Sequence, residues 1–305
     1  MQMLNEIIEN SNISKIASCY KRSPLQVNKI HECDSEIIKL NEDIYLAVTT
    51  DSISEEIDTG LYDDPWLIGW MAVTANLSDI AAVGAKPVGL VISQIISDNT
   101  NEVFIKRLSD GISDACEEYD TYILGGDLNS GNQLIITGTA TGIIEKGNIL
   151  TRKGINKGET IYISGKAGLG NAYALNKFSS TPGLTINYKP KARIKEGILL
   201  REYASACMDT SDGVISTIDQ LSRINNTGFE INDYEHLLDP EALKASEYYN
   251  FPSWLFLAGQ HGEFELIFSI PKEKTGEFLE KAGEINWYPL ELGIATVEKS
   301  ITLPL

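Results

Sequence analysis

Aspartate recurs in four short motifs, beside glycine, serine or threonine. These motifs are Thr49-Thr50-Asp51, Asn76-Leu77-Ser78-Asp79, Gly125-Gly126-Asp127 and Asp209-Thr210-Ser211-Asp212-Gly213. One such aspartate is usually a cap or turn residue, but four in one chain suggest a shared site. Carboxylates that converge repel each other and normally need a divalent metal between them. With Mg²⁺ in that place the natural ligand is a polyphosphate, and the predicted chemistry is phosphoryl transfer.

A glycine-rich turn at residues 165–170, GKAGLG, is the other candidate for contact with phosphate. Lys166 comes too early, and the glycines are wrongly spaced, for either GxxxxGK[ST] or GxGxxG. We therefore interpret the segment first as a tight strand-to-helix turn with close backbone packing. If it does bind phosphate, we expect the contact through amides at the helix N-terminus rather than through Lys166.

Composition excludes nucleic acid and anionic membranes as main ligands. The chain has 305 residues, 43% of them hydrophobic and 22% charged. Its 43 acidic and 25 basic side chains give a net charge of −18, which disfavours binding to polyanionic surfaces. A nucleotide bound by such an acidic protein would need an accompanying cation. The length is sufficient for two domains of ordinary size.

Cysteine usage and hydropathy predict a reduced, cytoplasmic protein. Cys19, Cys33, Cys116 and Cys207 lie far apart without a CxxC pair, and the three histidines lack zinc-type spacing. Residues 1–12 lack the basic start and apolar stretch of a signal peptide, and no apolar run is long enough to cross a bilayer. We expect neither structural zinc nor a membrane partner.

Alternating strands and helices must position the motifs. Strands are expected at 44–50, 88–96, 122–124, 134–144, 160–164, 265–270 and 290–297, and helices at 65–83, 101–119, 191–206, 213–224 and 272–282. Asp51 and Asp127 then fall at strand ends, Asp79 lies on the first helix, and Thr100 is the N-cap of the second. Glycine, lysine and asparagine accumulate at 147–158. We predict an α/β (α+β) protein with an N-terminal domain at 1–150 and a C-terminal domain at 151–305.

The order of the motifs resembles one enzyme family. NLSDIAAVGAKP at 76–87 is preceded by TTDSISEEID at 49–58 and followed by GGD and DTSDG. This pattern is similar to the family of aminoimidazole ribonucleotide synthetase, thiamine-monophosphate kinase, selenophosphate synthetase and the hydrogenase maturation protein HypE. Thiamine-monophosphate kinase is the most similar in wording, from about Asp34 to Val297. The resemblance implies a two-domain fold of the aminoimidazole ribonucleotide synthetase type, in which the N-terminal domain forms the dimer interface and nucleotide and metals lie between the domains.

The resemblance also implies roles for individual residues. Mg²⁺ ions that bridge the phosphates of the co-substrate ATP would be held by Asp34, Asp51, Asp79, Asp127, Asp209 and Asp212. The catalytic residues would be Asp51, Asp127 and Asp212. The nucleotide site would be lined by Asn76, Gly126, Arg152 and Ser211. Positioning and charge neutralisation by metals would supply most of the catalysis, without a covalent protein intermediate.

One departure from the family pattern affects the metals. The kinases read Gly-Asp-Asp-Ala-Ala-Val where this chain reads Glu32-Cys33-Asp34-Ser35-Glu36-Ile37, so Cys33 takes the place of an aspartate. A thiol is a poor Mg²⁺ ligand. Either Glu32 or Glu36 compensates, or one metal binds weakly.

Other departures affect the acceptor. Asp58 replaces a histidine that the family associates with thiamine phosphate, and residues 152–155 read RKGI in place of Arg-Ser-Gly-Ala. Residues 260–266 read QHGEFEL in place of Gly-Gly-Glu-Asp-Tyr-Glu-Leu. We expect Asp58, His261 and Glu263 to line the acceptor pocket.

We predict an ATP- and Mg²⁺-dependent phosphotransferase that acts on an oxygen of a small molecule, as a homodimer, with the acceptor left open. Thiamine-monophosphate kinase itself is one version of this hypothesis. A catalytically reduced nucleotide-binding or regulatory homologue is an alternative, motivated by Cys33 and the altered acceptor segments. A selenophosphate synthetase-like activity is another, because Cys19-Tyr20-Lys21 weakly resembles that family's reactive segment, without its glycines.

Overall fold

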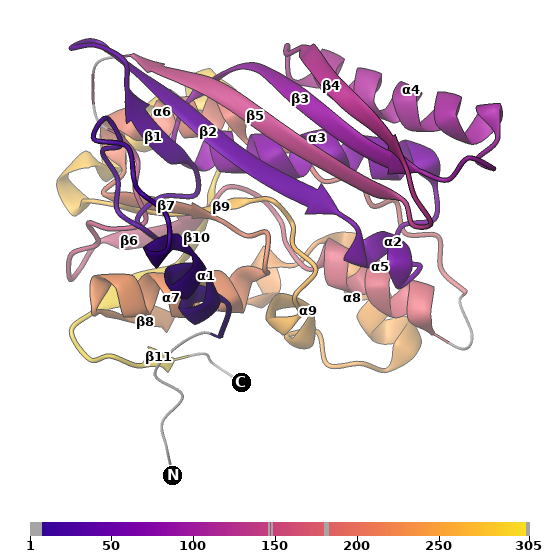
Figure 1. Ribbon diagram of the computed structural model, residues 1–305. Coiled ribbons are helices and arrows are strands. Elements are labelled where there is room, and N and C mark those ends of the chain that lie inside the picture. Colours follow the sequence, from indigo (N-terminus) through magenta and orange to yellow (C-terminus); the bar gives the residue numbers. More distant parts are fainter. Residues whose placement is uncertain (1–7, 146, 148, 180–182, 303–305) are drawn as a thin grey trace.

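The chain folds into two β-sheets and their covering helices, in a computed structural model (Figure 1). The structure describes residues 8–145, 147, 149–179 and 183–302. Strands and helices alternate in both halves, which confirms the predicted mixed α/β class. Residues 1–7 of the segment expected to lack a signal peptide lie outside the described ranges.

Sheet A lies in the N-terminal half and has the strand order β1-β2-β5-β3-β4. Its strands are β1 (Glu36–Lys39), β2 (Ile44–Ile53), β3 (Lys86–Ile96), β4 (Ile123–Ser130) and β5 (Ile135–Glu145). The helices of this half are α1 (Ile8–Ser18), α2 (Glu55–Asp58), α3 (Pro65–Ala82) and α4 (Glu102–Glu118). Along β5 buried and half-exposed residues alternate, as expected for a strand with one covered face. Figure 1 shows α3 and α4 behind that face.

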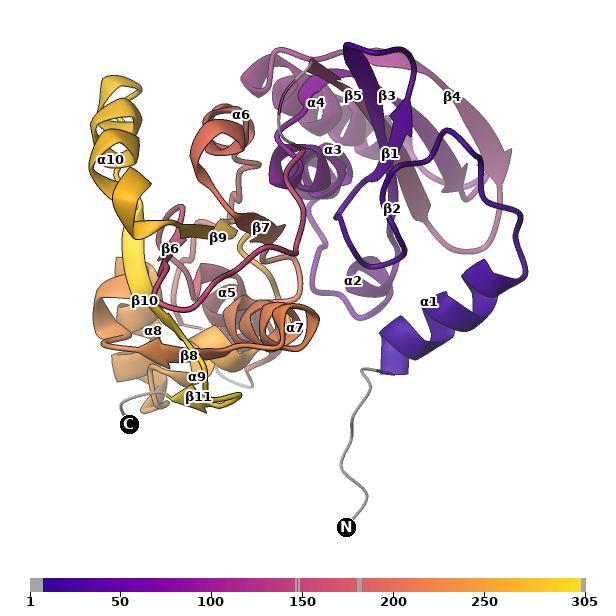
Figure 2. The same cartoon turned by 90° about the vertical axis from the view of Figure 1, so that its left-hand side faces the viewer.

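Sheet B lies in the C-terminal half and has the strand order β11-β8-β10-β6-β9-β7. Its strands are β6 (Thr160–Ile163), β7 (Ala206–Asp209), β8 (Gly228–Ile231), β9 (Leu266–Ile270), β10 (Leu290–Thr296) and β11 (Ile301–Thr302). Its helices are α5 (Leu169–Phe178), α6 (Ile194–Tyr203), α7 (Val214–Asn225), α8 (Pro240–Tyr249), α9 (Leu255–Ala258) and α10 (Thr275–Glu284), with 3-10 turns at Glu235–Leu237 and Lys272–Lys274. The two sheets fall on either side of the predicted boundary near residue 150, and Figure 2 shows the two lobes.

Helix α3 is buried along most of its length and contacts both lobes. Asp64 caps it by accepting a hydrogen bond from the backbone N–H of Trp66, and Pro65 occupies the first turn, where an N–H would have no helical partner. The helix packs closely against α6, since a Cβ on Gly197 would lie 2.0 Å from the carbonyl oxygen of Ala81. This contact fixes the C-terminal end of α3, which carries Asp79, against the second lobe.

A segment that we call the strap, residues 188–193, ties the lobes together from the other end of α3. The indole N–H of Trp70 donates to the carbonyl oxygen of Pro190 at 2.8 Å. The hydroxyl of Tyr188 donates to the carbonyl oxygen of Gly262 at 2.9 Å, in the loop before β9. One apolar core cluster accordingly runs through both lobes.

Several expectations about the elements were wrong. Asp51 and Asp127 lie inside β2 and β4 rather than at strand ends, because both strands remain paired with their neighbours beyond these residues. The N-cap of α4 is Asn101, not Thr100, and its side chain accepts from the N–H of Phe104. The helix expected at 191–206 is confined to α6, because the chain becomes extended at Ala204 and enters β7.

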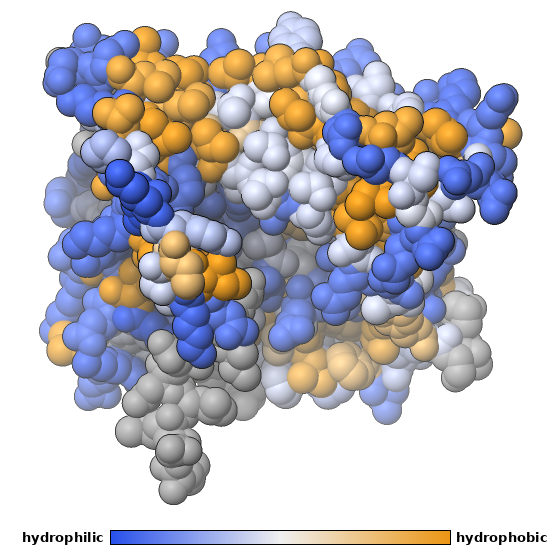
Figure 3. All heavy atoms as spheres, in the orientation of Figure 1, coloured by the Kyte–Doolittle hydropathy of each residue, from blue (hydrophilic) through white to orange (hydrophobic). Residues whose placement is uncertain are grey.

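None of the described helices covers the outer face of sheet A (Figure 1). β4 is exposed along its whole length, and the exposed apolar side chains of β3 and β4 are Val88, Val91, Ile123, Leu124 and Leu128. Figure 3 shows apolar patches on this face on both sides of a pale, weakly polar stretch. Within the described ranges, no helix combines the length and apolarity that a bilayer crossing demands.

Candidate functional site

Asp34, Asp79 and Asp209 form the centre of the candidate site. Each contributes a carboxylate oxygen, and these oxygens lie within 4.8 Å of one another. Asp34 precedes β1, Asp79 lies in the last turn of α3, and Asp209 ends β7. Among the described residues, this is the one acidic, histidine or cysteine group with metal-ligand spacing. The structure thus brings three of the six predicted metal ligands together where the two lobes meet.

Hydroxyl groups hold these carboxylates in place. Thr49 donates to Asp79 Oδ2 from β2 at 2.5 Å. Ser78 donates to Asp209 Oδ2 at 2.6 Å, and Ser211 donates to Asp209 Oδ1 at 3.0 Å. Because a hydroxyl can donate without adding a positive charge, these bonds orient the carboxylates and leave their negative charge in place.

Asp51, on β2, lies close enough to these carboxylates for its charge to raise the pKa of Asp79. Its backbone N–H donates to Asn76 Oδ1 at 3.1 Å, and Asn76 Nδ2 donates to the carbonyl oxygen of Ala72 at 3.0 Å. Asn76 is fully buried, so it braces β2 against α3. This structural role was not expected from the sequence, which suggested a nucleotide contact.

The cluster formed by Asp34, Asp79 and Asp209 contains more negative than positive charge. Burial, followed by the charges of Asp51, Asp209 and Asp34, raises the pKa of Asp79 well above its usual value. Burial and then the charge of Asp34 raise the pKa of Asp209 to about 7. A divalent cation would favour the ionised forms, so binding of such a cation would release protons near neutral pH.

Arg152 provides the positive charge that does reach the site. Its Nη2 donates to Asp34 Oδ1 at 3.0 Å, and the two side chains are only 16% and 1% exposed, respectively. Asp34 Oδ2 and Arg152 Nε are buried and have no hydrogen-bond partner among the residues that the structure describes. Because buried polar atoms are rarely left unpaired, they fit a site for a metal and an anionic oxygen. Carboxylate oxygens are the ligands that Mg²⁺ prefers.

Cys33 adds no ligand charge to this site. It is buried, and its thiol Sγ lies 3.8 Å from the carbonyl oxygen of Leu150. Burial, followed by the charges of Asp34 and Glu32, raises the pKa of Cys33 to about 12. We therefore expect a neutral thiol beside the carboxylates in the metal-free protein.

Glu32 and Glu36, either of which was a candidate to compensate for Cys33, make contacts outside the carboxylate group. Glu32 accepts a hydrogen bond from the backbone N–H of Lys29 at 2.8 Å. Glu36 pairs with Arg22 at 3.1 Å. Neither belongs to the group of three carboxylates, so the departure at Cys33 stands uncompensated in the described structure.

Gly126 and Asp127 lie apart from the carboxylate group. Gly126 on β4 and Asp51 on β2 lie at the same level of sheet A, with β3 and β5 between them. Three strand spacings, about 14 Å, therefore separate the two residues. Asp127 is aligned with Ser93, next to the buried Ile92, and so faces the uncovered side of sheet A. A Cβ on Gly126 would lie 2.1 Å from the carbonyl oxygen of Ile92, which gives this glycine a packing reason. One chain therefore does not place Asp127 with the other predicted ligands.

Asp209 to Gly213 form a tight turn at the end of β7. Ser211 binds Asp209, as described above, whereas Asp212 is exposed and does not belong to the three-carboxylate group. Gly213 has φ +89°, and a Cβ there would lie 2.1 Å from the carbonyl oxygen of Gly259. The turn thus requires glycine at Gly213.

Two of the three predicted acceptor residues lie on elements that face each other. Burial lowers the pKa of His261, and the charges of Glu56 and Glu55 on α2 act in the opposite direction. Asp58, at the end of α2, accepts a hydrogen bond from Gln133 Nε2 at 3.2 Å. The α2 segment and the loop with His261 therefore form an acidic surface with one titratable base.

Glu263, the third predicted acceptor residue, instead contacts the glycine-rich turn. Its Oε1 accepts hydrogen bonds from the N–H groups of Gly168 and Gly170, at 2.8 and 3.0 Å. These are the helix N-terminal amides considered above for phosphate binding. The carboxylate of the chain itself therefore satisfies them, and the interpretation as a structural turn is supported.

Sequence reasoning missed the residues that orient the site. Thr49 and Ser78 come shortly before an aspartate in the motifs, and this spacing is the signal that could have identified them. Glu265 was also missed: Arg193 Nε donates to its Oε2 at 2.8 Å, while its backbone N–H donates to Thr210 Oγ1 at 3.0 Å. No local pattern links Arg193 to Glu265, because they lie 72 positions apart along the chain.

Comparison with known proteins assigns the class of protein. Residues 33–144 match the family described as AIR synthase related protein, N-terminal domain. A solved structure of AaThiL complexed with AMPPCP and TMP has a TM-score of 0.80 at 23% identity, covering 99% of this chain and 94% of that one. A thiamine-monophosphate kinase from Aquifex aeolicus has a TM-score of 0.74 at 22% identity, covering 97% of each chain. The fold is that of the AIR synthase-related enzymes.

Sequence similarity narrows this class to one family. A thiamine-monophosphate kinase from Methanocaldococcus jannaschii is 34% identical over 261 residues, covering 78% of this chain and 79% of the relative. The chain therefore belongs to the thiamine-monophosphate kinase family. This membership confirms the expected class, an ATP-dependent phosphotransferase.

Proposed function

We propose that the protein transfers the γ-phosphoryl group of ATP, with Mg²⁺, to a small acceptor of the thiamine-monophosphate type. The observation that carries this proposal is the group formed by Asp34, Asp79 and Asp209. Their oxygens lie within 4.8 Å, the pKa values of Asp79 and Asp209 are raised, and Asp34 Oδ2 is buried without a partner. This donor set suits Mg²⁺, which would neutralise phosphate charge during transfer.

Different residues of the chain would position the metal and the phosphate groups. Asp34, Asp79 and Asp209 would hold the metal, with Thr49 and Ser78 fixing the carboxylate orientations. Arg152 would contact a phosphate oxygen through Nε, which has no protein partner. Asp51, inside β2, and the exposed Asp212 are proposed as further ligands at the edges of the site.

Thiamine monophosphate is the first acceptor to test, because the relatives bear that activity in their name. With ATP and Mg²⁺ we expect thiamine diphosphate and ADP in equal amounts, measured by chromatography of both products. The acidic surface at His261 is compatible with a cationic ring and is expected to weaken binding of the acceptor phosphate. Nucleotide binding without any thiamine diphosphate would refute this acceptor and leave the phosphotransferase proposal to a different one.

A second candidate function is nucleotide binding with reduced catalysis, and Cys33 is the observation that favours it. Substitution Cys33→Asp restores the family's aspartate next to Asp34. If a missing ligand limits the enzyme, we expect the substitution to raise ATP turnover and to tighten Mg²⁺ binding by about tenfold, which corresponds to about 1.4 kcal/mol. Cys33→Ser is the matched control, because it changes the side chain without adding charge. Equal turnover in all three proteins would contradict the idea of a missing ligand.

We also propose a homodimer through the uncovered face of sheet A. A long exposed strand edge with apolar side chains is an association surface, and a second copy is the partner implied by the resemblance. A metal contact by Asp127 would require such a copy. We expect the protein to sediment at twice the chain mass and Val91→Glu, which changes an exposed side chain of this face, to sediment as a monomer. Leu279→Glu, on the exposed side of α10, is the control, and a wild-type monomer would contradict the proposal.

The four cysteines are all unpaired, which is compatible with the proposed cytoplasmic location. No observation favours the selenophosphate synthetase-like alternative: Cys19 is exposed just beyond α1 and lies outside the carboxylate group.

A further inference from the structure

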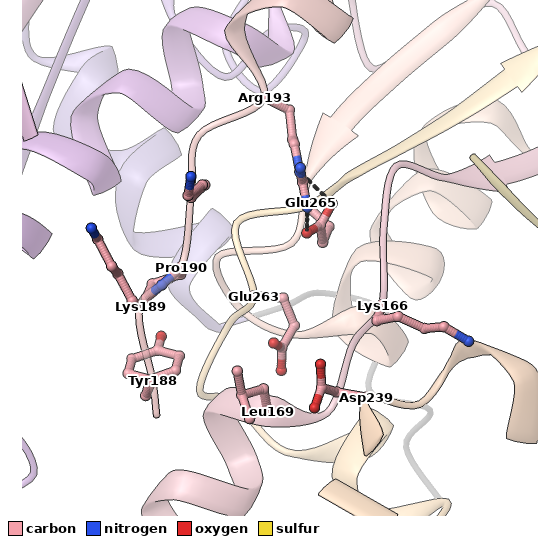
Figure 4. A pocket seen from close by; sticks show the side chains of 10 residues that line it. Lys166, Leu169, Tyr188, Lys189, Pro190, Arg193, Asp239, Glu263 and Glu265 are labelled. Carbon is pink, nitrogen blue, oxygen red and sulfur yellow. Dashed lines mark hydrogen bonds and ion pairs between the residues drawn. The ribbon is translucent and has the colours of Figure 1, made fainter. Parts of the chain in front are cut away.

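A cavity of about 300 Å³ lies between the strap and the first residues of α5 and α8 (Figure 4). This volume is at the lower end of the range for small-molecule sites. The cavity contains none of the residues of the metal-ligand group, and it is lined by four basic and three acidic side chains together with Leu169, Tyr188 and Pro190. Its function depends on which of these charges are already neutralised.

The four basic side chains are engaged with other groups. Their partners are Glu265 for Arg193, Glu118 for Lys191, the carbonyl oxygen of His236 for Lys166, and the ring of Trp70 for Lys189. In Figure 4 the side chains of Lys166 and Lys189 extend away from Glu263. Arg193 pairs with Glu265 and Lys191 with Glu118, whereas Lys166 and Lys189 contact neutral groups and keep their positive charge. None of these contacts is with the other two acidic side chains of the cavity.

Those two carboxylates, Glu263 and Asp239, point toward each other in the cavity (Figure 4). Glu263 is 6% exposed, and only its Oε1 accepts hydrogen bonds, from the N–H groups of Gly168 and Gly170. Asp239 caps α8 with Oδ1, which accepts from the N–H of Glu241 at 2.7 Å. In the described part of the chain neither carboxylate has an ion pair. Burial raises the pKa of Glu263 to about 8, which reflects the cost of this uncompensated charge.

We propose that the cavity binds a small organic cation through a primary ammonium group. The ammonium would donate hydrogen bonds to Glu263 Oε2 and to Asp239, and its carbon chain would pack on Leu169 and Tyr188. A compact metal ion does not suit the cavity, because its carboxylates do not form a group with metal-ligand spacing among the described residues. An ammonium is larger, carries three donors and matches two carboxylates on one side of an apolar wall. The inference holds whether or not the proposed phosphoryl transfer is correct.

A titration with n-butylammonium tests the site. We expect saturable binding in a ligand-observed NMR titration, and none with the neutral 1-butanol or the anionic butyrate, which have the same chain length. Glu263→Gln keeps an oxygen for Gly168 and Gly170 but removes the charge. It should weaken n-butylammonium binding by about tenfold or more, because it removes the negative charge that would accept the hydrogen bond of the ammonium.

Two further variants test whether binding depends on this cavity rather than on the overall acidity of the protein or on unfolding. Glu247→Gln removes one exposed carboxylate of α8, and it should bind n-butylammonium like the wild type. Leu169→Trp fills the cavity without changing any charge, and it should abolish binding while the protein still melts cooperatively. Absence of saturable binding to the wild type, or equal binding to the wild type and Glu263→Gln, would overturn the proposal.

Discussion

The substitution Asp79→Asn is expected to abolish Mg²⁺-dependent nucleotide binding and, at the same time, to stabilise the metal-free protein. The introduced asparagine would keep the shape of the side chain and can still accept the hydrogen bond from Thr49. It would remove one of three carboxylates that converge within 4.8 Å, so we expect the affinity for a non-hydrolysable ATP analogue with Mg²⁺ to fall by about 100-fold or more. Isothermal titration with and without Mg²⁺ measures this loss.

The gain in stability depends on pH. In the unfolded chain an aspartate titrates near pH 3.9, whereas in the folded protein the pKa of Asp209 is about 7 and that of Asp79 is also raised. The folded protein therefore binds protons more tightly than the unfolded chain, and its stability falls as the pH rises from about 4 through 7. Asp79→Asn removes part of this repulsion, so its melting temperature should exceed that of the wild type most clearly at pH 8.

The gain should appear as a shallower fall of melting temperature with rising pH in Asp79→Asn than in the wild type. Glu263, whose pKa is raised to about 8, contributes to the pH slope of both proteins and cancels in their difference. Asp110→Asn, in an exposed pair with Lys106, is the matched control and should change neither binding nor melting. Unchanged nucleotide affinity in Asp79→Asn would remove the carboxylate group from the proposed function.

Local patterns predicted the central elements well. The apolar spacing at 65–83 predicted α3, and the isoleucine- and threonine-rich run at 134–144 predicted β5. Sequence patterns predicted the bounds of strands less well where pairing with other strands determines them. β2 continues past Asp51 only because β5 pairs with it, and β7 is four residues long, too short for a periodic signal.

The candidate site was predictable in part, because ligand residue types are local but their convergence is not. The DTSDG motif identified Asp209, and the NLSD motif identified Asp79. That Asp127 faces the uncovered side of sheet A depends on strand order, which the motif cannot reveal. The association of Glu263 with Gly168 likewise arises from contact between distant loops. A motif therefore indicates which groups can bind, whereas the topology decides which of them meet.

Arg152→Met is expected to be among the most destabilising single substitutions in this chain. Arg152 and Asp34 form a buried ion pair at 3.0 Å, 16% and 1% exposed, respectively. Methionine fills similar space but leaves Asp34 charged, buried and close to Asp79 and Asp209. Removal of one partner from a buried pair costs about 3–5 kcal/mol. We therefore expect a corresponding loss in the free energy of unfolding of the metal-free protein at pH 8, measured by urea denaturation.

The same substitution distinguishes a structural from a ligand-binding role for Arg152. Below pH 5 protonation of the carboxylates should reduce the cost, and Mg²⁺ should stabilise Arg152→Met more than the wild type, because the metal replaces the lost positive charge. Arg223→Met, in an exposed i,i+4 pair with Asp219, should lose at most about 0.5 kcal/mol. If Mg²⁺ restores the stability of Arg152→Met but nucleotide affinity stays low, Arg152 contacts phosphate directly. If Mg²⁺ restores both, its role is to balance the carboxylates, and the proposed phosphate contact is wrong.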